Sequence, residues 1–549
     1  MDHYIVKIME NKLLVITNLF KKLLVKFRYR NKRDPFKEFQ KIMTNKFDKE
    51  INKGTILIAP YRVSPISNLF EGLIAYYFRL KGYNVKAIMC NQAVNICENL
   101  SKNKKRNCID CSLCLAEQNR FCKVFNVEKI SLNDFITKKE REIVTKLVNS
   151  RSFNVENDFL YNDLNFKEEI ESAVKRYTLS SNINDKKNII REFSKTAFLT
   201  SIALEKIQAE EKAIQLILSH GIYSTWGSLL KTANKVNLKS TVWGRGYVGQ
   251  GNLVFGKNKS YLEEVLNDDN WKEISITEEE EVVIKEYYVD KFKGDKFKRD
   301  YINYYNELQY EDFNKKSFFN EIDKYKYKFG MYTNIPWDGE VFNKSKGFPN
   351  NVTYITSVIN WFINNPDNCL VIRPHPAEKS GNEALFSEKF EDILYDLYPI
   401  LPDNVKLLSP ENPITSYELV NKVDANIIYG SSLSLEFAVM GFLVIQTGNF
   451  NVNNKGIVYE ANTIEELYEF MRSASLNKLI VTDEMKRNAL NYANYWINYK
   501  HLNDETMNLE KLKFKNFKFK NLIEFENNRT LGIVFDSITK DEIIIDKND

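Results

Sequence analysis

Two series of short Ile- and Val-rich runs, each alternating with helical segments, constrain this chain more than any other feature. The first series begins with TILIA at 55–59 and the second with FGMYT at 329–333. Further predicted strands follow at 85–89, 216–219, 240–243, 253–255, 369–373, 405–408, 425–429 and 443–446. Such alternation is typical of sheets with helices on both faces. The sequence therefore predicts an α/β protein with two facing, doubly wound, Rossmann-like domains, helical additions, and a ligand cleft outside the carboxyl ends of the strands.

The length of 549 residues is too great for one hydrophobic core. We expect a basic amphipathic helical segment at 1–50, a first domain at 51–265 with a cysteine-rich insertion at 90–122, a helical connection at 266–325, a second domain at 326–475, and C-terminal helices and a tail at 476–549. No apolar run approaches 18 residues, so no spanning helix is predicted.

The basic excess of the chain is concentrated at its beginning. Residues 1–33 hold nine Lys or Arg against Asp2 and Glu10, while the net charge of the whole chain is +5. A near-neutral remainder argues against nucleic acid as a partner. The apolar stripe at 11–33 predicts a basic amphipathic helix, which could lie on an anionic membrane or dock on its own domain. Because no signal peptide is evident, we expect a cytoplasmic protein, peripheral at the inner face of the membrane if that helix binds lipid.

Polar side chains follow two strands of the second series. Arg373, His375 and Pro376 lie in a proline-fixed loop after one strand, and Gly430, Ser431 and Ser432 lie between the next long strand and a helix. An Arg, an imidazole, two hydroxyls and a close backbone approach suit a phosphate or a nucleotide. His375 could instead only hold its turn, and either serine could simply cap the helix.

These motifs resemble those of bacterial capsule polysaccharide biosynthesis glycosyltransferases of the GT-B type. The resemblance rests on VIRPHPAE at 371–378, YGSSLSLEFAVMGFLVI at 429–445, MYTNIPWD at 331–338, GFPN at 347–350, SHGIY at 219–223, TVWGRGY at 241–247 and LVFG at 253–256. It covers about residues 55–475 and implies a GT-B-like fold, with an acceptor domain followed by a nucleotide-sugar domain.

In similar sialyl- and Kdo-transferases, which use CMP-sugars, a His-Pro motif and a paired-Ser motif bind the nucleotide. The resemblance therefore assigns this role to His375, Pro376, Ser431 and Ser432, with Glu436 at the ribose hydroxyls. Retaining GT-B enzymes often carry a second Glu eight residues earlier, where this chain has Ile428. That departure favours inversion of configuration at the transferred sugar.

The resemblance implies an enzyme that transfers a sugar from a nucleotide-activated donor to a capsule, surface-polysaccharide or glycolipid acceptor. A CMP-linked acid sugar is the first expected donor. Two alternatives stay open, namely a GT-B-shaped nucleotide-sugar 2-epimerase and a non-catalytic partner in capsule assembly or export.

Glycosyl transfer usually needs a base for the acceptor hydroxyl, and three residues are candidates. Glu71 follows the loop after the first strand, His220 follows a later strand, and Asp338 opens the second domain. A structural role is favoured for each, because nothing in the sequence fixes their mutual geometry.

Six of the seven cysteines cluster between 90 and 122, with Cys108, Cys111, Cys114 and Cys122 closely spaced after Cys90 and Cys97. In a cytoplasmic chain such spacing predicts metal ligands before disulfides. Four thiolates favour structural zinc, whereas the spacing is also similar to iron–sulfur motifs without their Cys-Pro context. Reduced thiols without metal are the third alternative. No other cofactor is predicted.

Overall fold

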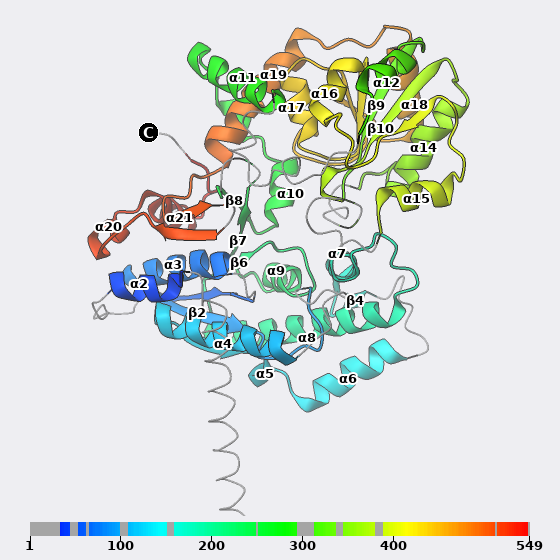
Figure 1. The fold of residues 1–549 in the computed structure, drawn as a ribbon. Coiled ribbons are helices and arrows are strands. Elements are labelled where there is room, and N and C mark those ends of the chain that lie inside the picture. Colours follow the sequence, from blue (N-terminus) through cyan, green and yellow to red (C-terminus); the bar gives the residue numbers. More distant parts are fainter. Residues whose placement is uncertain are drawn as a thin grey trace, which may run out of the picture.

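The computed structural model describes residues 33–43, 53–61, 65–98, 108–150, 159–246, 248, 251–293, 312–335, 337, 344–378, 388–510 and 513–546. Two layered α/β domains make up the molecule, one above the other in Figure 1. Apart from Arg33, the amphipathic segment predicted at 11–33 lies outside the described residues. Among the residues that are described, no helix is both long enough and apolar enough to cross a membrane.

The first domain contains a six-stranded sheet in the order β3-β2-β1-β6-β7-β8. Its strands are β1 (Thr55–Ile58), β2 (Asn84–Met89), β3 (Glu128–Ser131), β6 (Gln215–Ser219), β7 (Ser240–Arg245) and β8 (Leu253–Lys257). All neighbours pair in parallel except β7 and β8, which are antiparallel. The order reverses between β1 and β6, so this is the topological switch point of the domain.

Alternate side chains of β1 enter two separate cores, as expected for a strand covered on both faces. Leu57 joins the core formed with α8 (Lys187–Glu211) and α9 (Trp226–Lys235). Ile56 and Ile58 join the core formed with α2 (Pro35–Ile42), α3 (Pro65–Leu80) and α4 (Cys108–Phe125). Smaller elements of this domain are α5 (Leu132–Phe135), α6 (Lys138–Asn149), α7 (Lys167–Thr178) and the hairpin of β4 (Leu160–Tyr161) and β5 (Leu164–Asn165).

The second domain contains six parallel strands in the order β11-β10-β9-β12-β13-β14. They are β9 (Tyr327–Tyr332), β10 (Asn368–Arg373), β11 (Val405–Leu407), β12 (Ala425–Ile428), β13 (Val444–Gln446) and β14 (Tyr459–Glu460). Its helices are α14 (Asn351–Ile363), α15 (Phe390–Leu397), α16 (Ser416–Leu419), α17 (Leu433–Val439), α18 (Ile464–Ser475) and α19 (Asp483–Asn494). Strands β10 and β12 flank β9 on opposite sides, which places the switch point beside β9.

The segment between the two sheets begins on β7 and β8 of the first domain and then packs on the second domain. It contains α10 (Tyr261–Leu266), a 3₁₀ turn (Asn270–Glu273), α11 (Glu278–Phe292) and α12 (Lys315–Ile322). Trp271, Ile284 and Ile322 share a core with side chains of α17 and α19. Two doubly wound domains confirm the predicted fold class.

The end of the chain returns to the first domain. After α19, a π-helical turn (Tyr495–Lys500) leads to Leu502, which pairs with Leu253 of β8. A hairpin of β15 (Met507–Glu510) and β16 (Lys513–Phe517), then α20 (Leu522–Glu526) and α21 (Arg529–Lys540), complete the core around α2 and α3. The C-terminal region therefore contributes to folding of the domain with which the chain begins.

Candidate functional site

The switch point of the second domain brings together the predicted donor residues. His375 follows β10, Asn334 follows β9, and Gly430, Ser431 and Ser432 follow β12, so all of them lie at the carboxyl edge of three adjacent parallel strands. The side-chain amide of Asn334 donates to the carbonyl oxygen of Gly430, which ties two of these loops together. Ligands of open α/β sheets bind at this position.

The paired serines lie half-buried at the start of α17. The carbonyl oxygen of Ser431 accepts from the amide of Ser434 at 3.1 Å, and its hydroxyl accepts from the amide of Leu433 at 3.4 Å. The hydroxyl of Ser432, at the N-cap position, makes no capping hydrogen bond. Both hydroxyls can therefore donate to an anion.

Arg373 serves the loop and not the open edge. Its buried guanidinium donates to the carbonyl oxygens of Pro374 at 3.2 Å, Ser409 at 2.8 Å and Pro410 at 3.2 Å. Because the guanidinium donates to three backbone carbonyl oxygens, it fixes the path of the chain that leads into His375. A direct contact between Arg373 and a donor phosphate remains a prediction that this arrangement does not favour.

His375 is half-buried at the sheet edge, and Pro376 begins the 3₁₀ turn (Pro376–Glu378) behind it. Burial, and then the neighbouring Arg373 guanidinium, lower the pKa of His375 to about 4. The imidazole is therefore neutral near pH 7 and can both donate and accept a hydrogen bond. A neutral ring at this position suits a base, a sugar or a phosphate oxygen without requiring an ion pair.

Glu436, predicted at the ribose hydroxyls, points into the domain. One carboxylate oxygen accepts from Lys291 Nζ at 2.9 Å and the other from the Tyr417 hydroxyl at 2.7 Å, and the residue is buried. Both oxygens are thus engaged by α11 and α16. A ribose contact would require this internal pair to open.

His220 lies at the switch point of the first domain, directly after β6. Its φ of 61° is left-handed, its Nδ1 lies against the Ser219 hydroxyl, and its ring stacks on Trp226 with centroids 5.5 Å apart. The Trp226 indole in turn donates to the Ala59 carbonyl oxygen at the end of β1, at 3.0 Å. A half-exposed imidazole held in an unusual backbone conformation at a sheet edge is a candidate functional group.

The structure adds three polar residues around Trp226, on which His220 stacks, that the sequence analysis missed. The Tyr61 ring meets Trp226 edge-on at 6.3 Å, and its buried hydroxyl has no hydrogen-bond partner among the described residues. The Thr225 hydroxyl donates to the buried carboxylate of Glu98. Tyr61 follows the first strand, so its position in the sequence could have indicated that it lies at the carboxyl edge of the sheet. Nothing in the sequence connects Glu98 with Thr225.

The other two base candidates differ from His220. Glu71 is buried in α3, where it accepts from the Trp243 indole at 3.2 Å, so the structure gives it a packing role. Asp338 lies outside the described residues.

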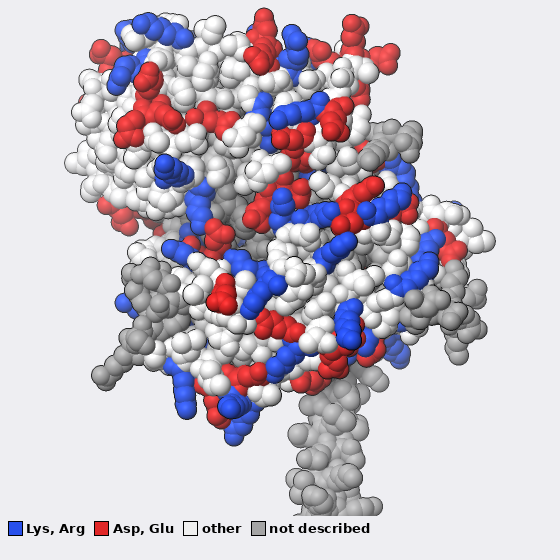
Figure 2. All heavy atoms as spheres, turned by 180° about the vertical axis from the view of Figure 1, so that it is seen from behind, with Lys and Arg blue, Asp and Glu red and all other residues white. Residues whose placement is uncertain are grey.

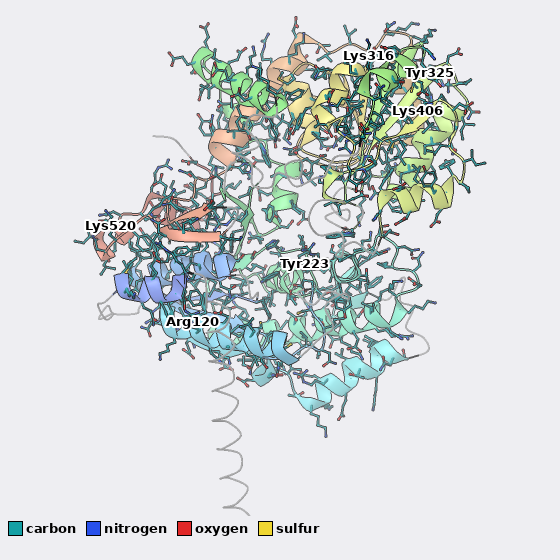
Figure 3. All side chains as sticks on the ribbon, in the orientation of Figure 1. Arg120, Tyr223, Lys316, Tyr325, Lys406 and Lys520 are labelled. Carbon is teal, nitrogen blue, oxygen red and sulfur yellow. The ribbon has the colours of Figure 1, made fainter. Side chains whose placement is uncertain are left out.

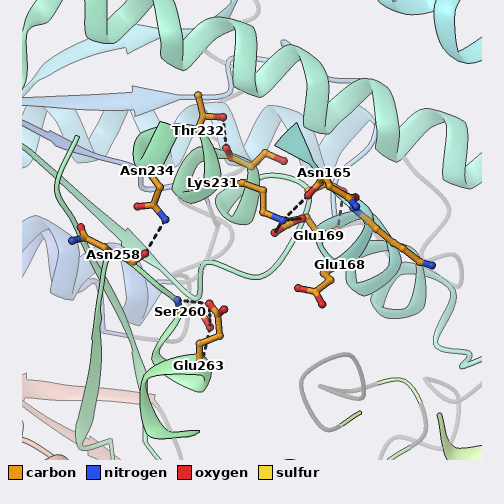
Figure 4. A network of polar contacts seen from close by, with 12 residues as sticks. Asn165, Glu168, Glu169, Lys231, Thr232, Asn234, Asn258, Ser260 and Glu263 are labelled. Carbon is orange, nitrogen blue, oxygen red and sulfur yellow. Dashed lines mark hydrogen bonds and ion pairs between the residues drawn. The ribbon is translucent and has the colours of Figure 1, made fainter. Parts of the chain in front are cut away.

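Helix α7 contacts both domains, through residues that follow strands of each sheet. Glu169 of α7 pairs with Lys231 of α9 at 2.9 Å (Figure 4). Its carbonyl oxygen accepts from the Ser224 hydroxyl in the loop after β6. The same helix reaches the second domain. Glu168 pairs with Lys344 at 3.0 Å, and Arg176 lies 5.0 Å from the ring of Trp337, in the loop after β9.

A further contact joins the two domains beyond α7. Glu388 accepts from both the amide and the hydroxyl of Ser181, at 2.6 and 2.7 Å. Tyr223, in the loop after β6, lies on the side of the first domain that faces the second (Figure 3). His220 belongs to the same loop after β6 as Tyr223.

The cysteine cluster does not form the predicted four-ligand set. Cys108, Cys111, Cys114 and Cys122 all lie on the single helix α4, whose rise of 1.5 Å per residue places Cys122 about 12 Å along the axis from Cys114. Sulfurs this far apart cannot share one ion, so including Cys122 was wrong. Burial raises the pKa of the Cys122 thiol to about 12. Among the described residues, no group of three or more His, Cys, Asp or Glu could hold a metal ion.

Zinc remains a prediction for the other cysteines. Purified full-length protein should then contain about one zinc per chain, and Cys111→Ser with Cys114→Ser should lower both metal content and stability, because metal affinity adds to folding free energy. Elemental analysis measures this, with Cys369→Ser in the second domain as the matched control. Metal-free protein of unchanged stability would leave reduced thiols as the answer.

No family model matches the sequence, and no curated protein is similar to it. Solved structures that resemble the fold include Thermosulfurimonas dismutans KpsC, a β-Kdo 2,4 transferase, at 14% identity and a TM-score of 0.31, covering 51% of this chain and 79% of that one. UDP-GlcNAc 2-epimerase from Neisseria meningitidis matches at 10% identity with a TM-score of 0.24, and the match covers 80% of this chain and 98% of that one. The N-terminal domain of Candida albicans trehalose-6-phosphate phosphatase matches at 8% identity with a TM-score of 0.31, and the match covers 90% of this chain and 98% of that one. At these values, the fold assignment rests on the strand order of the chain itself.

Proposed function

We propose that this protein is a glycosyltransferase that uses a nucleotide-activated sugar. The observation that supports the proposal is the pair of switch points in two domains joined through α7, with Ser431, Ser432 and His375 at one sheet edge and His220 at the other. The donor nucleotide binds the second domain, and the acceptor approaches from the first. This division places the reacting bond between the domains.

The donor side supplies neutral and hydroxyl groups for a phosphate. Ser431 and Ser432 donate to the phosphate oxygens, and neutral His375 completes the contact. A nucleoside monophosphate needs fewer cationic ligands than a diphosphate, so CMP-linked acid sugars are the first donors to test. Stabilising charge on the departing phosphate is the main task of these residues.

On the acceptor side, His220 acts as the base. The acceptor hydroxyl loses its proton to a ring nitrogen of His220, its oxygen forms a bond to the anomeric carbon, and the carbon–oxygen bond to the nucleotide phosphate breaks. Attack from the face opposite the leaving group inverts the configuration. The acceptors proposed are capsule polysaccharide, surface polysaccharide or glycolipid, met at the inner face of the membrane with residues 11–33 as an anchor.

No other partner is proposed. Basic and acidic side chains are interspersed over the face of the molecule seen in Figure 2.

A thermal-shift panel of CMP, CDP, UDP and GDP tests the donor. One nucleotide at about a hundred times its dissociation constant should stabilise the protein by about 2.7 kcal/mol and raise its melting temperature. CMP is the expected responder, and a response to another nucleotide would change the donor class. If no nucleotide stabilises the protein, the result would favour the alternative function, a non-catalytic partner in capsule assembly or export.

Product analysis separates the two enzyme classes. A transferase releases the nucleotide when the acceptor is added, whereas a 2-epimerase converts the nucleotide sugar without an acceptor. His220→Asn should abolish most of the transfer while nucleotide stabilisation persists, because the residue belongs to the other domain. Full activity in that variant would remove His220 as the base.

A further inference from the structure

One surface of the first domain carries more exposed cationic side chains than exposed carboxylates. It is formed by α2, by the β15–β16 hairpin and by α20, which lie side by side (Figure 1). Its exposed cationic residues are Arg33, Lys37, Lys41, Lys513, Lys515, Lys518 and Lys520, and its exposed carboxylates are Glu510 and Glu524. Asp34, Glu38 and Glu526 are half-buried, and Asp34 pairs with Arg120. Lys515 pairs with Glu510 across the hairpin, so the other cationic residues provide the excess charge of this surface. We call this surface the lysine face.

The packing of the hairpin explains why the lysines point outward. Phe517 and Phe519 are buried against Phe39 of α2, with ring centroids 5.8 and 6.4 Å apart. Lys518 and Lys520 alternate with these rings and are therefore exposed. Lys37 and Lys41, one helical turn apart, point away from the Phe39 side of α2. The sequence thus holds two sets of lysines on one side of a rigid core.

Two further observations indicate what this face meets. Ile523 in α20 is 72% exposed close to Lys520, which projects from the edge of the molecule (Figure 3). Arg33, the first residue that the structure describes, is held on this same face, because its guanidinium donates to the Lys515 carbonyl oxygen at 2.5 Å. Cations together with an exposed apolar side chain are the composition of surfaces that bind anionic lipid.

We infer that the lysine face docks on an anionic membrane surface and orients the first domain toward a lipid-linked acceptor. Lysine ammonium groups attract the headgroups of anionic lipids, and Ile523 enters the boundary with the acyl chains. This docking goes beyond residues 11–33, because it uses the folded domain, whose rigid attachment would fix the direction in which the interdomain region opens. Only the orientation toward an acceptor rests on the proposed function.

Vesicle sedimentation with the full chain tests the docking. The protein should bind phosphatidylcholine vesicles containing 30% phosphatidylglycerol, bind pure phosphatidylcholine much less, and dissociate as salt rises. Each basic residue near such a surface contributes a factor of about five in partitioning. Vesicle binding should therefore weaken at least tenfold when Lys37, Lys41, Lys513 and Lys520 are changed together to Gln. The Ile523→Ser variant should weaken the vesicle binding that remains at high salt concentration.

The matched control changes Lys139, Lys146, Lys316 and Lys478 to Gln, which removes the same charge from other exposed positions. It should leave binding within about twofold. Equal losses in both variants, or none in the first, would overturn the proposal and leave the segment at 1–32 as the whole anchor. Preference for a duplex oligonucleotide over vesicles would also overturn it. Because no donor or acceptor is present, a failure of glycosyl transfer would not affect this result.

Discussion

Replacing Lys500 by Met should lower the free energy of unfolding by about 3 to 5 kcal/mol, the loss expected when one partner of a buried ion pair is removed. Lys500 Nζ lies 2.8 Å from a carboxylate oxygen of Asp268, and both side chains are almost completely buried. With methionine in place of lysine, Asp268 would stay buried without its counter-charge. Denaturant unfolding of the full chain measures the change.

The side chains around Asp268 stabilise its charged form. Burial alone would raise the pKa of Asp268, but Lys500 and the hydrogen bonds from Tyr495 and Asn270 lower it below its ordinary value. The Tyr495 hydroxyl donates at 2.5 Å and the Asn270 side chain at 2.6 Å. Asp268 belongs to the segment that leaves the first domain, and Lys500 to the segment that returns to it. The pair therefore joins the two crossings between the domains.

Two variants control this prediction. Asp268→Asn combined with Lys500→Met removes both charges and should recover a large part of the lost stability, because no buried charge is left uncompensated. Lys486→Met breaks the exposed pair with Asp483 and should change stability by less than about 1 kcal/mol. A double variant as unstable as Lys500→Met alone would show that the charges are not coupled.

Local sequence pattern predicted the strands of both sheets wherever the strand was apolar. The runs at 55–59, 216–219 and 369–373 match β1, β6 and β10 within one residue at each end. Fully buried parallel strands must be apolar on both faces, so a short Ile- and Val-rich run identifies them. Sheet order was not predictable in the same way, because the pairing of β1 with β6 joins residues about 160 positions apart.

The missed elements are polar or depend on distant partners. Strand β3 reads EKIS and lies at an edge, where one side faces solvent. The β15–β16 hairpin has no Gly or Asn between its strands, so the usual turn signal is missing. Its packing on α2 connects opposite ends of the chain, and no local pattern encodes such a contact.

Within the candidate site, position was predictable but side-chain direction was not. His375, Ser431 and Ser432 follow strands, and parallel strands bring their carboxyl ends to one edge. Arg373 and Glu436 occupy the same region of the sequence, yet their partners Ser409 and Lys291 turn them inward. A charged residue near a predicted site is therefore a ligand only if nothing inside the domain satisfies it first.

Changing Ser431 and Ser432 together to Ala should weaken nucleotide binding by at least a factor of about ten to a hundred and fifty, which is the loss expected from one of the two hydrogen bonds alone. Each hydrogen bond to a charged phosphate contributes about 1.5 to 3 kcal/mol, and a lost hydroxyl leaves the phosphate oxygen without that donor. His375→Ala should cause a loss of the same order, because a neutral imidazole also donates one hydrogen bond. Calorimetry with the nucleotide identified by the thermal-shift panel measures all three affinities.

The fold should survive these changes, which is what makes the affinity loss informative. Ser431, Ser432 and His375 are half-buried at a sheet edge, and Ser432 makes no capping hydrogen bond that alanine would remove. Thr482→Ala is the matched control, since Thr482 caps α19 through the Met485 amide at 3.1 Å and lies away from the strand ends. That variant should lose about 1 kcal/mol of stability and no nucleotide affinity. Unaltered affinity in folded Ser431, Ser432 and His375 variants would move the donor site away from the carboxyl edge of β9, β10 and β12.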